Sequence, residues 1–118
     1  SGHDPRGPED KRLPFADAEP GMAGAETLLS TTLTLVRDGV IDLPRAFDLL
    51  AGAPARLLGV DAGLLREGHE GDIALVDPEK PWVVDRRKMA ATADNTPFDG
   101  QPMQGRVLGL WKGGVRVD

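Results

Sequence analysis

The first half of the chain carries hydrophobic residues at helical spacing. Between residues 24 and 37 these residues fall three and four positions apart, which places them on one helical face: Ala25, Leu28, Leu29, Leu33 and Val36. Asp38-Gly39 follows, and glycine is the usual residue just beyond a helix end. The pattern predicts an amphipathic helix over residues 24–37.

Shorter elements are expected on both sides of this helix. Residues 1–21 are expected to form a loop, because prolines and glycines interrupt every helical stretch. Asp42 can cap a helix that runs to about Leu50. A break is expected at Gly52, followed by a short helix from Pro54 to Leu58 that ends at Gly59.

The second half has a strand-like pattern. Two apolar runs, residues 72–77 and 82–85, are separated by a turn-like connection at 78–81, and one helical turn is expected within 86–93. Residues 106–111 and 115–117 flank Lys112-Gly113-Gly114, which predicts a hairpin. Helices before residues 60–70 and strands after them indicate two packing environments.

Composition excludes several classes of protein. The 118 residues carry a net charge of −5 and no basic stripe, which argues against a nucleic-acid partner. No apolar run approaches the roughly 20 residues that a membrane span needs. The chain has no cysteine, so neither a disulfide nor a thiolate metal site can form. We therefore expect a cytoplasmic protein with no membrane partner.

Two blocks of the chain resemble a known family. The first is the loop that leads into the long helix, with matches at Pro14, Phe15, Gly21, Gly24, Glu26 and Thr27. The second is Asn95-Thr96-Pro97-Phe98-Asp99-Gly100, followed by Gly105-Arg106-Val107. Over essentially its whole length, the chain resembles the last quarter of the dihydroorotases, the amidohydrolases of de novo pyrimidine biosynthesis.

The resemblance implies an α/β fold in two parts. Residues 1–62 would form the end of a metal-dependent-hydrolase TIM barrel, comprising the loop after strand 8 and the following helices. Residues 63–118 would form the C-terminal part of a composite β-sandwich domain. The activity implied is the reversible conversion of N-carbamoyl-aspartate to dihydroorotate. Zinc is implied for the parent enzyme, but its ligands would precede this chain, so no metal ligand is assigned within it.

The implied site lies at the start of the chain. Where the family's eighth strand ends Asp-His-Ala-Pro-His, this sequence reads Gly2-His3-Asp4-Pro5-Arg6. Gly2 thus stands in the position of the catalytic base and cannot take a proton. Arg6 replaces the histidine that holds the substrate carboxylate, a role that an arginine can fill with two parallel hydrogen bonds.

Three further residues are candidates for this site. Asp4 is the one nearby carboxylate that could replace the missing base, although it also suits a turn before proline. Pro20 and Gly21 match the position where the family's loop offers backbone groups to the pyrimidine ring, and they equally suit a tight turn.

Other polar residues are given structural roles. His3 and His69 lack metal-ligand spacing, so neither is expected to bind metal. Glu26 and Thr27 are expected to stabilise the start of the helix, and Thr96-Pro97-Phe98 is expected to pack the tail against the barrel. The basic run Arg86-Arg87-Lys88 is expected to be a solvated face.

Three readings of function remain open. The first is an enzyme, and the second is a non-catalytic dihydroorotase-like subunit, favoured by Gly2, with aspartate transcarbamoylase or a second copy of itself as partner. The third is a free-standing α+β binding module. On each reading, we expect exposed apolar surface on the helix that carries Leu28, Leu29, Leu33 and Val36, unless a partner covers it.

The 118-residue chain by itself is predicted neither to bind catalytic metal nor to turn over dihydroorotate, because the implied metal ligands lie outside it. Purified chain assayed with added zinc should show no turnover above a blank. Measurable hydrolysis of dihydroorotate by this chain would contradict the prediction.

Overall fold

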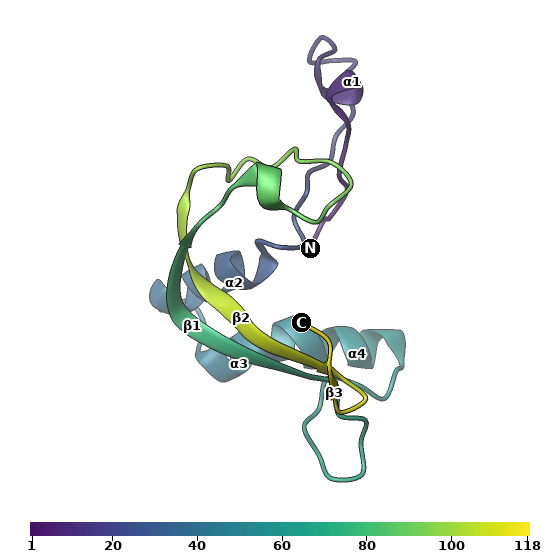
Figure 1. Ribbon diagram of the computed structural model, residues 1–118, viewed down its shortest axis with the longest axis vertical. Helices are drawn as coiled ribbons and strands as arrows, with labels where there is room; N and C mark the ends of the chain where they lie inside the picture. The colour runs from purple at the N-terminus through teal and green to yellow at the C-terminus, as the bar shows by residue number, and fades with distance from the viewer. The chain divides into compact units, whose positions relative to one another are not determined.

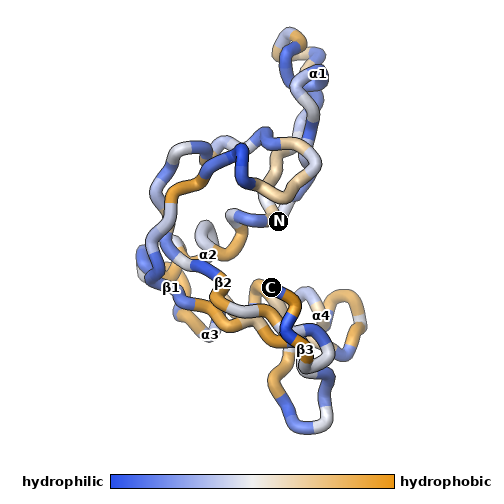
Figure 2. The backbone as a smooth tube through the Cα atoms, in the orientation of Figure 1, coloured by the Kyte–Doolittle hydropathy of each residue, from blue (hydrophilic) through white to orange (hydrophobic).

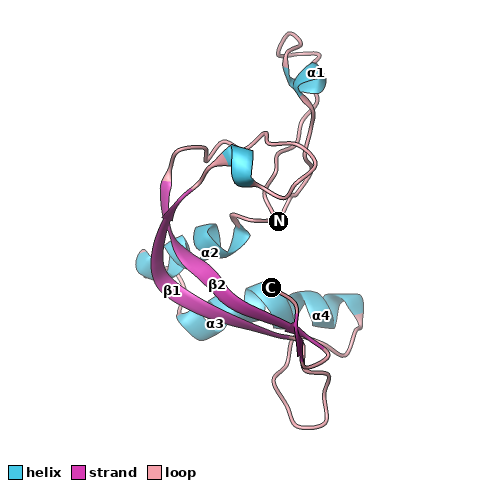
Figure 3. Ribbon diagram, in the orientation of Figure 1, coloured by secondary structure: helices cyan, strands magenta, loops and turns pink.

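The computed structural model describes all 118 residues and has an α/β architecture of short helices and one three-stranded sheet (Figures 1 and 3). Its contacts divide the chain into two compact units. The first joins Ser1–Leu28 to Pro81–Met103, and the second joins Leu29–Lys80 to Gln104–Asp118. Each unit therefore combines segments that are distant in sequence. The assignment of 1–62 to a barrel end and of 63–118 to a β-sandwich stays a prediction.

The amphipathic helix is α2, Leu28–Arg37, which begins later than predicted because residues 25–27 form a turn. It ends as the sequence predicts, around Gly39. The Gly39 N–H donates to the Val36 carbonyl at 3.1 Å and the Val40 N–H to the Leu35 carbonyl at 2.9 Å. These bonds satisfy carbonyl groups that the helix end would otherwise leave without a partner.

The predicted break at Gly52 is wrong. Helix α3 (Leu43–Phe47) continues through a π-helical turn, Asp48–Gly52, directly into α4, Ala53–Leu58. Pro54 explains the wider turn, since its ring would collide with the carbonyl four residues earlier in a regular α-helix. The ends agree with prediction: the Asp42 side chain accepts from the Arg45 N–H, and Gly59 closes α4 in the left-handed conformation.

A small ion-pair network lies over this π-helical turn. Asp48 pairs with Arg45 at 2.6 Å and with Arg56 at 2.8 Å. A Cβ atom added at Gly52 would come within 2.6 Å of the Asp48 carboxylate, so the glycine leaves room for the pair. The hydrogen bond from Arg56 is the main cause that lowers the pKa of Asp48.

The sheet has the order β1-β2-β3, with β1 at Ile73–Val83, β2 at Pro102–Lys112 and β3 at Val115–Arg116. Strands β2 and β3 form the predicted hairpin, pairing Trp111 with Arg116 in antiparallel register. The predicted turn at 78–81 is wrong, because β1 runs through both of its prolines. Proline is tolerated in a strand at the sheet edge, where its missing N–H is not needed.

Leu33 is the centre of the small core in the second unit, where it is 2% exposed. Its contact on β2 is Gly105, whose φ is +102° and whose added Cβ would lie 2.4 Å from Leu33 Cδ1. The Ser30 hydroxyl donates to the Gly105 carbonyl at 3.0 Å. The face of α2 for which exposed apolar surface was predicted is therefore partly covered within the chain: Leu33 is buried, and Leu28, Leu29 and Val36 are half-buried.

Hydrophobic surface is exposed elsewhere instead. Buried apolar side chains are few: Ala23, Leu33, Ala46, Ala55 and Val84. By contrast, Leu57 and Leu65 are 87% and 86% exposed, and apolar residues follow α4 and the strands of the sheet (Figure 2). A surface of this kind marks an interaction site more often than a free face.

The first unit is built mainly from loops. It contains one short helix, α1 (Pro8–Lys11), where the sequence predicted only loop; Pro8 in the first turn and the acidic residues after it favour this turn. The predicted helical turn within 86–93 is reduced to a 3₁₀ turn at Arg86–Lys88. None of the helices in the structure has both the length and the hydrophobicity needed to cross a membrane.

We predict that Lys112→Met raises the pKa of Asp72. In the structure a hydrogen bond from the Lys112 ammonium, and then one from the Gly113 N–H at 2.8 Å, hold the pKa of this carboxyl below its ordinary value. Stability from this contact is therefore present above the unfolded-state pKa of about 3.9 and is lost as the pH falls through the lower folded-state value. A carboxyl NMR titration measures the change.

Lys80→Met is the matched control for this titration, because it removes the same charge from a lysine that does not contact Asp72. An Asp72 midpoint that is equal in Lys112→Met and Lys80→Met would contradict the assigned cause.

Candidate functional site

Two stretches of the first unit lie side by side and bring the predicted site residues together. His3 and Met22 form an isolated parallel β-bridge, and the Asp4 N–H donates to the Met22 carbonyl at 2.8 Å. As a result, the segment that holds Asp4 and Arg6 is placed against Pro20-Gly21, which is not a turn but an irregular stretch that leads into the bridge at Met22.

Asp4 and Arg6 form an ion pair. The Arg6 Nη2 and Nε atoms donate to Asp4 Oδ2 at 2.9 Å and 3.2 Å. The hydrogen bond and the charge of Asp4 raise the pKa of the Arg6 guanidinium. While Asp4 occupies these two donors, a second carboxylate can bind the Nε and Nη2 edge of Arg6 only by replacing Asp4.

Gly21 is required here by close packing within the chain. Its φ is +117°, and an added Cβ would lie 2.5 Å from the Asp4 carbonyl oxygen and 2.7 Å from Asp4 Oδ2. A side chain would therefore push Asp4 out of its place. Pro20 precedes it on an exposed stretch of the loop.

Gly2 lies at the exposed start of this segment, with a φ of +60° and no atom within 4 Å of an added Cβ. An aspartate would thus have room at this position, and aspartate is among the residues that tolerate this backbone conformation. The absence of a carboxylate here is a property of the sequence and is not imposed by packing.

His3 has a structural use. Its Nδ1 atom accepts from the backbone N–H groups of Gly24 and Ala25, at 3.2 Å and 3.1 Å. Since a backbone N–H can only donate, the proton of the neutral ring resides on Nε2. His69 belongs to the other unit, where Arg66 donates to its Nε2 at 2.8 Å. No group of three or more potential metal ligands occurs in the structure.

Asn95 is a central residue of this unit that sequence reasoning missed. Its Oδ1 accepts from the Arg6 N–H at 2.9 Å, and its Nδ2 donates to the Gly21 carbonyl at 3.0 Å. Its own carbonyl accepts from the Ala23 N–H at 3.0 Å. Only its place in the block 95–100 could have pointed to it.

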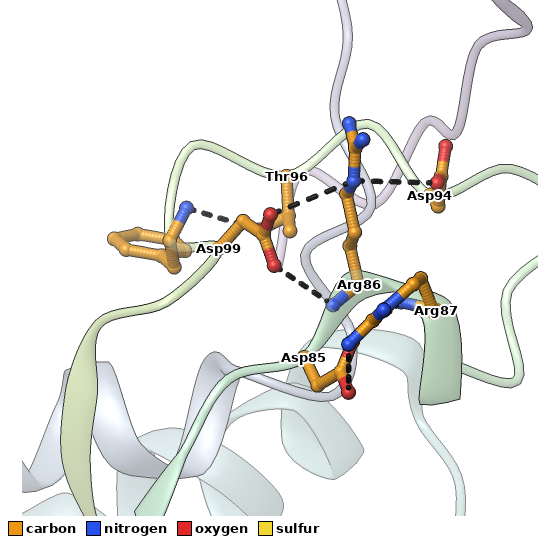
Figure 4. Close-up of polar contacts among 7 residues, drawn as sticks. Asp85, Arg86, Arg87, Asp94, Thr96 and Asp99 are labelled. Atoms are coloured by element: carbon orange, nitrogen blue, oxygen red, sulfur yellow. Dashed lines mark hydrogen bonds and ion pairs between the residues drawn. The ribbon is translucent and has the colours of Figure 1, made fainter.

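The loop that carries Asn95 is closed at its base and braced inside. Val84 exchanges two backbone hydrogen bonds with residues 100 and 101, at 2.8 Å and 3.0 Å. The Arg86 N–H donates to Asp99 at 3.0 Å, and its Nε lies 3.5 Å from Asp99 and 3.7 Å from Asp94 (Figure 4). Arg86 thus joins the two acidic residues on either side of Asn95.

Neighbouring polar residues complete this loop. Arg87 donates to Asp85, which lowers the pKa of that carboxyl, and the Thr96 hydroxyl accepts from the Phe98 N–H at 3.3 Å (Figure 4).

Glu26 has a structural role, but through a contact that the sequence did not predict. It precedes α2 and accepts from the Ala90 N–H at 2.8 Å, so it ties two loops together.

Known proteins with similar sequences include several named dihydroorotase. The chain is 40% identical over 106 residues to the dihydroorotase of Citrifermentans bemidjiense and 39% identical over 115 residues to that of Geobacter metallireducens. A dihydroorotase-like protein of Pseudomonas aeruginosa is 39% identical over 107 residues. These matches cover 90%, 98% and 91% of the chain, which spans about a quarter of each relative.

Solved structures with a similar fold include a dihydropyrimidinase and an L-hydantoinase. Dihydropyrimidinase from Brevibacillus agri matches 98% of the chain and 26% of its own, with a TM-score of 0.88 at 25% identity. L-hydantoinase from Arthrobacter aurescens matches 86% of the chain and 23% of its own, with a TM-score of 0.79 at 30% identity. No family model matches the chain.

Gly21→Ala is predicted to destabilise the first unit by about 1–3 kcal/mol, the usual cost of a strained backbone position. The Asp4 N–H should also lose its protection from hydrogen exchange, because the new methyl group displaces the Asp4 backbone. Gly100→Ala is the control, since Gly100 also has a positive φ of +74° but no atom within 4 Å of an added Cβ. Equal losses of stability and protection in both variants would show that the contact with Asp4 is unimportant.

Proposed function

We propose that this chain, which is related in sequence to the dihydroorotases, forms the C-terminal part of a dihydroorotase-like amidohydrolase. The whole protein would interconvert N-carbamoyl-aspartate and dihydroorotate in the cytoplasm, as a step of pyrimidine biosynthesis. Residues 1–62 would supply the end of its barrel, and residues 63–118 would supply part of a composite sheet domain. The chain spans about a quarter of its relatives, so this activity belongs to the larger protein.

The observation that carries the proposal is the placement of Arg6 beside Gly21. Both substrate and product carry carboxylates, and a guanidinium binds a carboxylate through two parallel hydrogen bonds. Arg6 already holds one carboxylate, that of Asp4, through Nε and Nη2. A substrate carboxylate would replace Asp4 on the same donors, next to the backbone of Pro20 and Gly21.

This exchange gives Asp4 a defined part in the proposed reaction. While it is paired with Arg6, its Oδ2 already accepts two hydrogen bonds. Once the substrate takes Arg6, the Asp4 carboxylate is released within the same site and can take up a proton. Binding of the substrate and availability of the base would thus be coupled in one step.

The residues of this chain do not fit a metal site. His3 uses Nδ1 for two backbone N–H groups, and no cluster of metal-binding side chains exists in the structure. The zinc ion that the family resemblance implies would therefore be held by residues outside these 118.

Gly2 favours a second candidate function. A protein that lacks the usual base could persist as a non-catalytic dihydroorotase-like subunit, assembled with itself or with aspartate transcarbamoylase. The structure leaves room for an aspartate at this position, so packing does not explain the glycine.

A chimera tests both candidates. This chain would replace the matching segment of the Geobacter metallireducens dihydroorotase, and the chimera would be compared with its Gly2→Asp variant. If Asp4 serves as the base, the chimera hydrolyses dihydroorotate and Gly2→Asp changes kcat little. If the chain is non-catalytic, Gly2→Asp should raise kcat by about 10²–10⁴-fold, the usual contribution of a general base.

Arg6→Lys is the accompanying variant. It keeps the charge but loses the paired donors, so the KM for dihydroorotate should rise about tenfold with kcat nearly unchanged. Binding of dihydroorotate that is equal in Arg6→Lys, Arg6→Ala and the unmodified chimera would remove the proposed role of Arg6.

A further inference from the structure

We infer that Asn95 is a positioning residue that fixes the distance between Arg6 and the Pro20-Gly21 segment, and thereby sets the affinity of the site for a carboxylate-bearing cyclic amide. The inference rests on the proposed function, because it concerns the same site. Asn95 does not need to touch the substrate for this role. It acts through the two backbone groups that its side chain holds.

Both the oxygen and the nitrogen of the Asn95 side-chain amide form hydrogen bonds. Its acceptor oxygen binds the N–H of Arg6 at 2.9 Å, and its donor nitrogen binds the carbonyl of Gly21 at 3.0 Å. A primary amide is the one side-chain group of this size that presents an acceptor and a donor on the same carbon. The two bonded backbone groups belong to the two segments that carry the proposed substrate contacts.

We refer to the two side-chain bonds from Asn95 to Arg6 and Gly21 as the Asn95 clamp. Further contacts of the same loop hold this clamp in place. The Asn95 carbonyl accepts from the Ala23 N–H at 3.0 Å, so a third bond ties the same loop to the segment that holds Gly21. Arg86 joins Asp94 and Asp99 on either side of Asn95 (Figure 4). The clamp is also partly shielded from water, since Asn95, Arg6 and Gly21 are all half-buried.

A change in this spacing should act on substrate binding. Arg6 binds a carboxylate through the geometry of its donors as well as through its charge. Its backbone must therefore lie at a fixed distance from the Pro20-Gly21 segment. Loss of the clamp would weaken contacts that are made equally in the ground state and in the transition state. Such a loss raises KM and leaves kcat nearly unchanged.

Two substitutions separate the two halves of the clamp. Asn95→Ala removes both side-chain bonds. Asn95→Asp keeps an oxygen for the Arg6 N–H but faces the Gly21 carbonyl with a second oxygen in place of the N–H donor. Gln101→Ala is the matched control, because the Gln101 side chain donates to Pro97 within the same loop and does not reach Arg6 or Gly21.

Hydrogen exchange of the 118-residue chain gives the first readout, which needs no activity. In Asn95→Ala the Arg6 N–H should exchange about tenfold faster or more, and in Asn95→Asp it should stay protected. The Ala23 N–H, which binds the Asn95 backbone, should stay protected in both variants and so reports that the loop is still folded. An Arg6 N–H that is unprotected in the parent chain, or unchanged in Asn95→Ala, overturns the inference.

Kinetics in the chimera give the second readout. Asn95→Ala should raise the KM for dihydroorotate about tenfold with kcat within about twofold, Asn95→Asp should raise it less, and Gln101→Ala should leave it unchanged. A fall in kcat at constant KM would mean that Asn95 only stabilises the fold, and would overturn the positioning role. A parent chimera that neither binds nor hydrolyses dihydroorotate refutes the proposed function, whereas the exchange pattern still decides whether the clamp exists.

Discussion

The candidate site depends on backbone pairing between residues 3–4 and Met22. A parallel bridge and the hydrogen bond from Asp4 to Met22 join two stretches that are about twenty residues apart. Glycine at position 21 permits this approach, because any side chain there would collide with Asp4. This pairing and the side chain of Asn95 together hold Arg6 close to the Pro20-Gly21 segment.

The ion pair between Asp4 and Arg6 is suited to exchange. Both side chains are partly exposed, so water screens their attraction and the pair holds them only weakly. A bound carboxylate can therefore compete for Arg6, while the backbone contacts around the pair stay in place. In this arrangement, the fixed parts of the site are main-chain groups and Asn95, and the charged side chains are the parts that can change partners.

The second unit illustrates how little of the chain's hydrophobic surface is buried. Leu33 is enclosed by the close approach of Gly105, whereas Leu57 and Leu65 face solvent almost completely. The chain spans about a quarter of the length of its relatives, and exposed apolar surface of this extent is typical of interaction sites. This agrees with the function proposed above.

The sequence alone predicted the end of the long helix, the Asp42 cap and the final hairpin, because each follows from local spacing or from turn residues, and its two motif blocks carried the resemblance to the dihydroorotases. It failed at Gly52, where a π-helical turn accommodates Pro54 without a break, and at residues 78–81, where an edge strand of the sheet accommodates both prolines. Only the tertiary structure could pair Asp4 with Arg6 against Gly21 and place Asn95 between them. These contacts join residues up to 89 positions apart, and no local pattern encodes a partner at that distance.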